Sequence, residues 1–255
     1  MLLSKRKSAT RTYSAPALEK GLDILELLAG RTEGMTQSRI AAALGRSTSE
    51  IFRMLCVLEA RGYLRRDPSA DTYHLTTRLF AMSHQHPPTR TLLEAALPAM
   101  RRLAEQVRQS CHLAVLHELE VMTIAHIDSP EPRGITVRLG ARFPILQTAS
   151  GYLLLAMMEE PERAALLEAL VPDPAGLPAV LRQIEAIRAR GYERHRSRTI
   201  AGIVDLSYPV RDHAGRTVAA LTVPYLCRRG ERDDKADVQA AIAATAEEIS
   251  RSVEA

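Results

Sequence analysis

The chain has 255 residues, of which 46% are hydrophobic and 25% charged, and its formal net charge is +4. This length allows two domains with separate cores, and the composition is that of an ordinary globular protein. No apolar run approaches 18 residues, and no long apolar segment follows the basic N-terminus, which argues against a membrane span and a secretory signal. The three cysteines are far apart and form no CxxC pair, so we expect reduced thiols in a cytoplasmic protein.

Residues 1–16 carry four basic side chains and no acidic one: Lys5, Arg6, Lys7 and Arg11. Residues 17–75 hold eight basic and eight acidic side chains, so the basic excess of this part of the chain lies at its start. We therefore predict a flexible basic arm over residues 1–16 that could lie along DNA phosphates, with a solubilising tail as the alternative.

A first helix is predicted over Ala17–Ala29, and two short helices joined by a tight turn follow within Thr36–Tyr63. Gly45 ends the first of the pair because glycine accepts a left-handed backbone. Ser47 begins the second as its N-cap, with Glu50 in the capping-box position. Its buried stripe is formed by Ile51, Leu55 and Leu58.

The exposed N-terminal face of this second helix offers small polar residues and an arginine, which suits a recognition helix in the DNA major groove. Two short strands follow around the turn Asp67–Asp71, and a hairpin in this place is a wing. We thus predict a winged helix-turn-helix over residues 17–76; a helical bundle that binds nothing is the alternative. The predicted DNA-contacting residues are Arg46, Ser47, Thr48, Ser49, Arg53, Arg65 and Arg66.

A linker is predicted over residues 77–90, because the adjacent prolines Pro87 and Pro88 cannot sit inside a helix. Residues 91–255 then mix helices and strands without regular alternation, which predicts an α+β domain. The predicted helices are Thr91–Gln109, Gly151–Met158, Glu162–Leu170, Ala179–Arg190 and Asp234–Val253. The predicted strands are Cys111–His117, Val121–Ile127, Ile135–Leu139, Ile203–Arg211 and Thr217–Leu226.

Several blocks, in order and spacing, resemble the IclR family of bacterial transcription regulators from Ala17 to about Val253. They include ALEKGLDILELL at 17–28, LEARGYLRRD at 58–67, YHLTTRLF at 73–80, VRLGARFPILQTASGYLLLA at 137–156, IRARGY at 187–192 and GIVDLSYPVRDHAGRTVAALTV at 202–223. The resemblance implies a linker helix and a GAF-like or PAS-like effector-binding domain with an antiparallel sheet flanked by helices. It also implies homodimers, often paired into dimers of dimers, that bind a palindromic double-stranded operator and sense a small organic or aromatic acid.

The same resemblance places the effector at six positions: Ala149, Ser150, His195, Asp205, Thr222 and Pro224. Family members that bind small ketoacids carry Asp at the position of His195, Cys at Asp205 and Ser at the last two. Unless a cation or His195 compensates, a carboxylate at Asp205 repels a ligand carboxylate, which argues against effectors resembling glyoxylate or pyruvate. The backbone amides at the helix start beside Ser150 can still hold an anion.

Two other functions can be considered from the residues. His195 and Asp205, with His112 or His126, could form a metal site; we favour ordinary polar residues, and predict neither metal nor cofactor. An enzyme that uses the C-terminal pocket is the alternative to a regulator. The sequence has no G-x-S-x-G, no HExxH and no glycine-rich phosphate loop, so we predict that the protein is not an enzyme.

Overall fold

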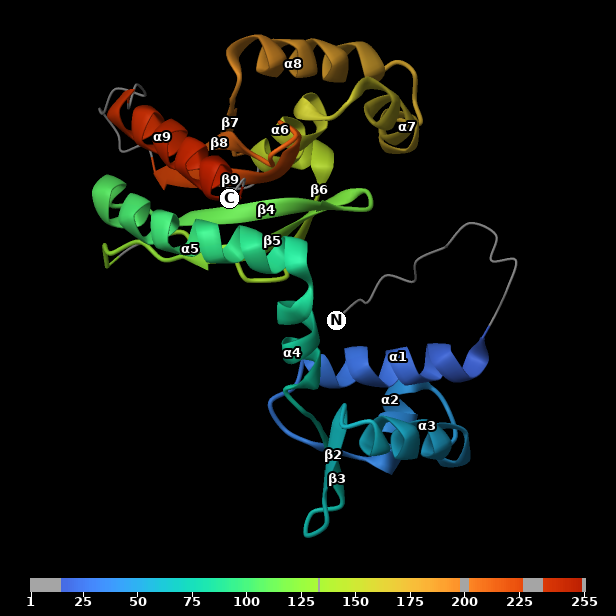
Figure 1. Cartoon of the computed structure of the whole chain (residues 1–255). Coiled ribbons are helices and arrows are strands. Elements are labelled where there is room, and N and C mark those ends of the chain that lie inside the picture. The colour runs from blue at the N-terminus through green and yellow to red at the C-terminus, as the bar shows by residue number, and fades with distance from the viewer. Residues whose placement is uncertain (1–14, 133, 198–201, 227–235, 254–255) are drawn as a thin grey trace. The chain divides into compact units, whose positions relative to one another are not determined.

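The computed structural model describes residues 15–132, 134–197, 202–226 and 236–253. The chain divides into two compact units between Pro87 and Pro88 (Figure 1). Residues 1–14 of the predicted basic arm, the first two residues of the predicted helix Asp234–Val253, and Cys227 lie outside the described residues. Among the described helices, none combines the length and apolar character that crossing a bilayer requires.

The N-terminal unit is a winged helix-turn-helix, as predicted. Its sheet has the antiparallel strand order β1-β3-β2, and its core contains the fully buried side chains Ile24, Ile40, Ile51 and Leu55. These residues pack the three helices together, and Leu64 and Tyr73 of the wing strands belong to the same core. In chain order the elements are α1 (Pro16–Ala29), β1 (Met35–Thr36), α2 (Gln37–Leu44), α3 (Thr48–Ala60), β2 (Leu64–Asp67), β3 (Thr72–Leu75) and α4 (Arg78–Gln85).

Local capping sets the ends of the two central helices. Thr36 accepts a hydrogen bond from the Arg39 amide at the start of α2, and Gly45, with φ 64°, ends it. Ser47 and Glu50 form a complete capping box at the start of α3, which confirms the predicted cap. Because each cap satisfies amides that a helix start leaves without partners, both boundaries are encoded locally.

The C-terminal unit is built on a six-stranded antiparallel sheet of order β6-β5-β4-β9-β8-β7. One core lies between the sheet and helices α5 and α9, and a second lies between the sheet and α6, α7 and α8. This arrangement confirms the predicted α+β fold. The elements are α5 (Pro87–Val107), β4 (Cys111–His117), β5 (Glu120–Ile127), β6 (Arg142–Pro144), the 3₁₀ turn η1 (Ile145–Gln147), α6 (Ala149–Met157), α7 (Glu160–Leu170), α8 (Leu177–Arg190), β7 (Glu193–Arg196), β8 (Ile203–Arg211), β9 (Thr217–Leu226) and α9 (Ala236–Val253).

The predicted strand over Ile135–Leu139 is wrong. This segment is irregular, and the strand that pairs with β5 is β6, whose Phe143 lies opposite Val121. The segment is held instead by side chains, since the Ser110 hydroxyl donates to the Ile135 carbonyl. Its alternating apolar residues line a pocket and so resemble a half-buried strand in sequence.

Helix starts and one strand also differ from the prediction. α5 begins at Pro87 rather than Thr91, because proline is tolerated in the first turn, where amides have no helical partner. α6 begins at Ala149, two residues before the predicted start. β7 was not predicted, since its four residues, Glu193–Arg196, are all charged or histidine.

The start of α6 lies directly against the backbone of η1. The Thr148 hydroxyl accepts a hydrogen bond of 3.0 Å from the Gly151 amide and caps the helix. A Cβ atom at Gly151 would lie 2.2 Å from the Ile145 carbonyl oxygen. Glycine is therefore required at this position to bring the helix start against the preceding turn.

We expect Gly151→Ala to lower the free energy of unfolding by about 1–3 kcal/mol, because backbone atoms must move to admit the methyl group. Gly21→Ala is the matched control: it also lies inside a helix, but has open space around its Cβ position, and should leave stability unchanged or slightly raised. Urea unfolding of the full chain measures both. Equal stabilities for the two variants would contradict the close contact.

Candidate functional site

The N-terminal face of α3 exposes the hydroxyl residues predicted to contact DNA. Ser47, Thr48 and Ser49 are all exposed. Arg53, one turn further on, is also exposed and makes no ion pair or hydrogen bond within the described part of the chain. This face thus offers small polar groups beside an uncommitted guanidinium, which suits contacts with base edges and phosphates.

Two ion pairs connect the start of α3 to α1. Arg46 is predicted to contact DNA, but its guanidinium lies 2.9 Å from the Asp23 carboxylate. The Glu50 carboxylate lies 3.0 Å from the Lys20 ammonium, and hydrogen bonds from the Ser47 amide and from Lys20 lower the pKa of Glu50 to about 2. Lys20 therefore balances the one negative charge on this face, a partner that the sequence pattern did not reveal.

The wing carries the other two predicted DNA contacts. Arg65 is exposed, and among the described residues it has no ion-pair partner. Arg66 donates to the Asp71 carboxylate, which raises the pKa of the Arg66 guanidinium, and lies over the Tyr73 ring at 5.8 Å. Arg66 thus supports the hairpin, and Arg65 is the freer cation.

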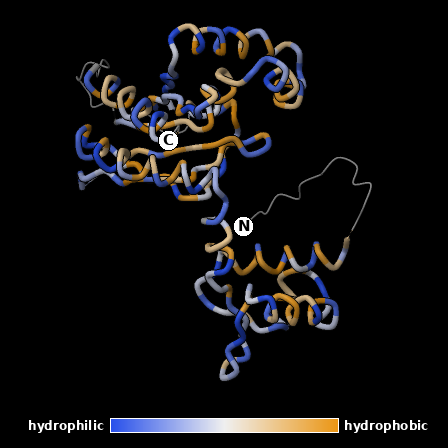
Figure 2. The backbone as a smooth tube through the Cα atoms, viewed as in Figure 1, coloured by the Kyte–Doolittle hydropathy of each residue, from blue (hydrophilic) through white to orange (hydrophobic). Residues whose placement is uncertain are grey.

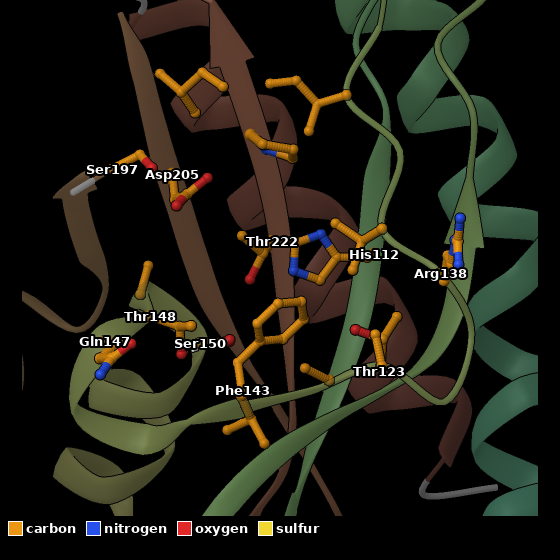
Figure 3. Close-up of a pocket in the computed structure, with 18 of the residues that line it drawn as sticks. His112, Thr123, Arg138, Phe143, Gln147, Thr148, Ser150, Ser197, Asp205 and Thr222 are labelled. Carbon is orange, nitrogen blue, oxygen red and sulfur yellow. Dashed lines mark hydrogen bonds between the residues drawn. The ribbon is translucent and has the colours of Figure 1, made fainter. Parts of the chain in front are cut away.

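A pocket of about 400 Å³ opens in the C-terminal unit between the sheet, the segment 135–138 and the start of α6 (Figure 3). Five of the six predicted effector contacts line it: Ala149, Ser150, Asp205, Thr222 and Pro224. They come together because strand alternation places the last three on one face of β8 and β9.

His195 is the predicted residue that does not line the pocket. It lies opposite Asp205 in the β7–β8 ladder, stacks on Tyr152 at 6.3 Å between ring centroids, and is itself buried. Its proximity lowers the pKa of Asp205, against the larger opposing effect of burial. His195 therefore lies beside the pocket residue Asp205 and outside the pocket lining as described.

Asp205 is half-buried on the pocket wall, and its side chain makes no hydrogen bond within the described part of the chain. Burial raises the pKa of its carboxyl from the ordinary 3.8 to about 6. The group is still mostly ionised at neutral pH, so the folded protein holds a desolvated charge on the pocket wall.

His112 presents an unsatisfied polar atom at the pocket. The side chain is 9% exposed, and its Nδ1 is buried without a partner in the described chain. Burial, with a smaller contribution from His126, lowers the pKa of His112 to about 4, so its imidazole is neutral at physiological pH. The described residues contain no group of three or more potential metal ligands, and His126 pairs with Asp128 instead.

The sequence missed most of the remaining lining. Thr123 and Phe143 reach the pocket from the sheet, and the segment 135–138 reaches it from an irregular part of the chain. Period-two alternation could have placed Thr123 on the same sheet face as His112, but no local pattern reports that segment 135–138 closes the opposite wall.

Asp205 generates a pH-dependent prediction. Its raised pKa means that the unpaired charge destabilises the fold above about pH 6, and protonation relieves this penalty as the pH falls toward 4. Asp205→Asn should therefore be more stable than wild type at pH 7.5, by about 2–3 kcal/mol at most, and the difference should vanish near pH 4.

Urea unfolding across this pH range measures the effect. Asp212→Asn is the opposite control, because hydrogen bonds from Arg216 lower the pKa of Asp212; that variant should lose stability at pH 7.5 and regain parity in acid. A stability difference for Asp205→Asn that stays constant with pH would show that the group carries no buried charge.

Two family models match the chain: the IclR helix-turn-helix domain over residues 17–68, and the bacterial transcriptional regulator IclR C-terminal domain over residues 88–251. The chain is 29% identical to the glycerol operon regulatory protein of Streptomyces coelicolor, over 92% of this chain and 95% of that protein. It is 27% identical to the HTH-type transcriptional regulator KdgR of Dickeya chrysanthemi, over 93% and 79% respectively.

Solved structures agree with this assignment. Pseudomonas aeruginosa HmgR is 27% identical, with a TM-score of 0.74 over 94% of this chain and all of that one. An IclR homolog from Microbacterium hydrocarbonoxydans, complexed with 4-hydroxybenzoate, is 21% identical and has the same fold, with a TM-score of 0.79 over 93% and 98% of the two chains. The protein belongs to the IclR family of bacterial transcriptional regulators.

Proposed function

We propose that this protein binds a palindromic operator in the cytoplasm through the N-terminal face of α3, and that a small organic acid in the C-terminal pocket alters this binding. The observation that supports the DNA contact best is the exposed row of Ser47, Thr48 and Ser49 beside Arg53. Arg65 on the wing adds a phosphate contact outside the major groove. The pocket volume of about 400 Å³ suits a ligand with a single ring, and one relative of the same fold was solved with 4-hydroxybenzoate.

We further propose that the chain acts as a homodimer, with a dimer of dimers as the larger assembly. The exposed apolar side chains Leu18 and Leu22 on α1 and Phe80 and Met82 on α4 support this proposal, with exposed fractions of 64%, 49%, 63% and 46%. Figure 2 shows hydrophobic residues recurring along α1. Covering these side chains against a second copy removes apolar surface from water and sets two recognition helices on two half-sites.

Arg53→Ala should weaken binding to an operator fragment selected with the wild-type protein by about 1–3 kcal/mol, and should reduce the salt dependence of binding. Arg102→Ala is the control, since Arg102 is an exposed cation of the other unit that pairs with Glu248. Fluorescence anisotropy over a salt series measures both. If Arg53→Ala folds and binds the operator with wild-type affinity, the proposed DNA contact through α3 is wrong.

Leu22→Glu combined with Phe80→Glu should shift the protein toward monomers in sedimentation equilibrium and lower its operator affinity, because like charges would meet across the proposed interface. Leu181→Glu, at a 38% exposed leucine of α8, should leave both properties unchanged. A double variant that sediments as wild type would place the interface elsewhere.

A further inference from the structure

Phe52 is a large apolar side chain that the N-terminal unit leaves in solvent. It lies on α3 and is 49% exposed, whereas its neighbours Ile51 and Leu55 on the same helix are fully buried. The core described for this unit is built from other side chains. Removing an aromatic ring from water is favourable, so a partner that covers Phe52 is bound more tightly because of it.

The residues around Phe52 on α3 belong to the surface proposed to contact DNA. Helix positions three and four residues apart share a face, so Ser49 lies one turn before the ring and Cys56 one turn after it. Both are exposed, and so is Arg53, the next residue in the chain. The ring therefore lies within the surface of α3 through which we propose that the protein binds its operator. The inference rests on that proposed function, because it concerns the same helix.

The polar neighbours of the ring favour DNA over a second copy of the chain as its partner. An apolar contact between copies at Phe52 would also cover the Ser49 hydroxyl and the Arg53 guanidinium. Within the described residues Arg53 has no carboxylate partner, and desolvating such a cation is strongly unfavourable. A duplex supplies phosphate oxygens and base-edge acceptors to both groups, so it covers the ring without that cost.

A phenylalanine ring has no hydrogen-bonding atom, which limits what it recognises on a base pair. In the major groove the polar edges of the bases present donors and acceptors, and the C5-methyl group of thymine is the one alkyl group. The sugars of the backbone also offer apolar surface, but contact with them carries no sequence information. Phe52 therefore adds sequence specificity by packing against a thymine methyl group.

We propose that Phe52 is a specificity-determining residue that packs against the C5-methyl group of one thymine in each operator half-site. Cys56, whose thiol behaves as a small apolar group, extends this surface by one turn. In a dimer the two copies of Phe52 read thymines at symmetry-related positions. Arg53 supplies polar contacts beside the ring, and Phe52 distinguishes thymine from the bases that lack a methyl group.

Replacing thymine by uracil in the operator tests this contact, because uracil pairs as thymine does and lacks only the methyl group. In an operator duplex selected with the wild-type protein, thymines are replaced one symmetric pair at a time, and fluorescence anisotropy measures the affinity. At one pair we expect a loss of about 4-fold per methyl group, and thus about 15-fold for the pair. If no pair of replacements weakens binding, the proposal is overturned. This series uses the wild-type chain, so it does not depend on the folding of a variant.

The variant Phe52→Ala assigns the methyl contact to this side chain. It should bind the thymine and uracil operators with equal affinity at the position where the wild-type protein distinguishes them. Val57→Ala is the matched control: Val57 is 55% exposed on the same helix, but lies about 140° around it from Phe52. This control should keep the wild-type discrimination. Full discrimination by Phe52→Ala overturns the assignment of the residue.

Two further measurements separate this inference from the proposed function. If uracil has no effect but Arg53→Ala still weakens binding, α3 contacts DNA and the role of Phe52 is wrong. If neither uracil, Phe52→Ala nor Arg53→Ala alters operator affinity, the proposed DNA contact of α3 is wrong as well. If uracil has no effect and Phe52→Ala shifts the protein toward monomers in sedimentation equilibrium, the ring packs against a second copy, and the proposal is overturned.

Discussion

The alternation of side chains across the six-stranded sheet is the constraint on which the C-terminal unit depends. In β8, Val204 and Leu206 enter the core beneath α5 and α9, and Asp205 between them faces the pocket. In β9, Leu221 enters the same core and its neighbour Thr222 faces the pocket. A sheet covered on both faces favours apolar residues throughout. Polar residues at alternate positions of these strands therefore lie on the sheet face that α6–α8 cover, at the part of that face where the pocket replaces helix packing.

Local signals predicted the elements, and distant contacts escaped prediction. The capping box of Ser47 and Glu50 is complete within four residues, so sequence was sufficient to find it. The segment Ile135–Leu139 carries apolar residues for a pocket wall, and from sequence this pattern cannot be told from a strand. The resemblance to the IclR family named five pocket residues that the structure gathers. It did not reveal that His195 lies beside Asp205 on the next strand, because that depends on the register of the unpredicted strand β7.

Asp205 illustrates a conflict between stability and recognition. A desolvated carboxylate without a donor is unfavourable in the isolated fold, and an apolar residue of similar size would remove the penalty. Asp205 lines the same pocket as His112, whose Nδ1 is buried without a partner within the described residues. A ligand that donates a hydrogen bond to such a carboxylate offsets part of this unfavourable free energy on binding. A residue that lowers stability in the free protein can thus favour ligands that hydrogen-bond to it.

The two ion pairs that join α1 to α3 extend the reach of a change far from the operator. Lys20 and Asp23 lie three positions apart on one rigid helix and hold Glu50 and Arg46 at the front of the recognition helix. The same helix exposes Leu22 to solvent in a single copy. If a second copy covers Leu22, as proposed, the helix that forms the dimer contact is the same helix whose ion pairs hold the start of α3.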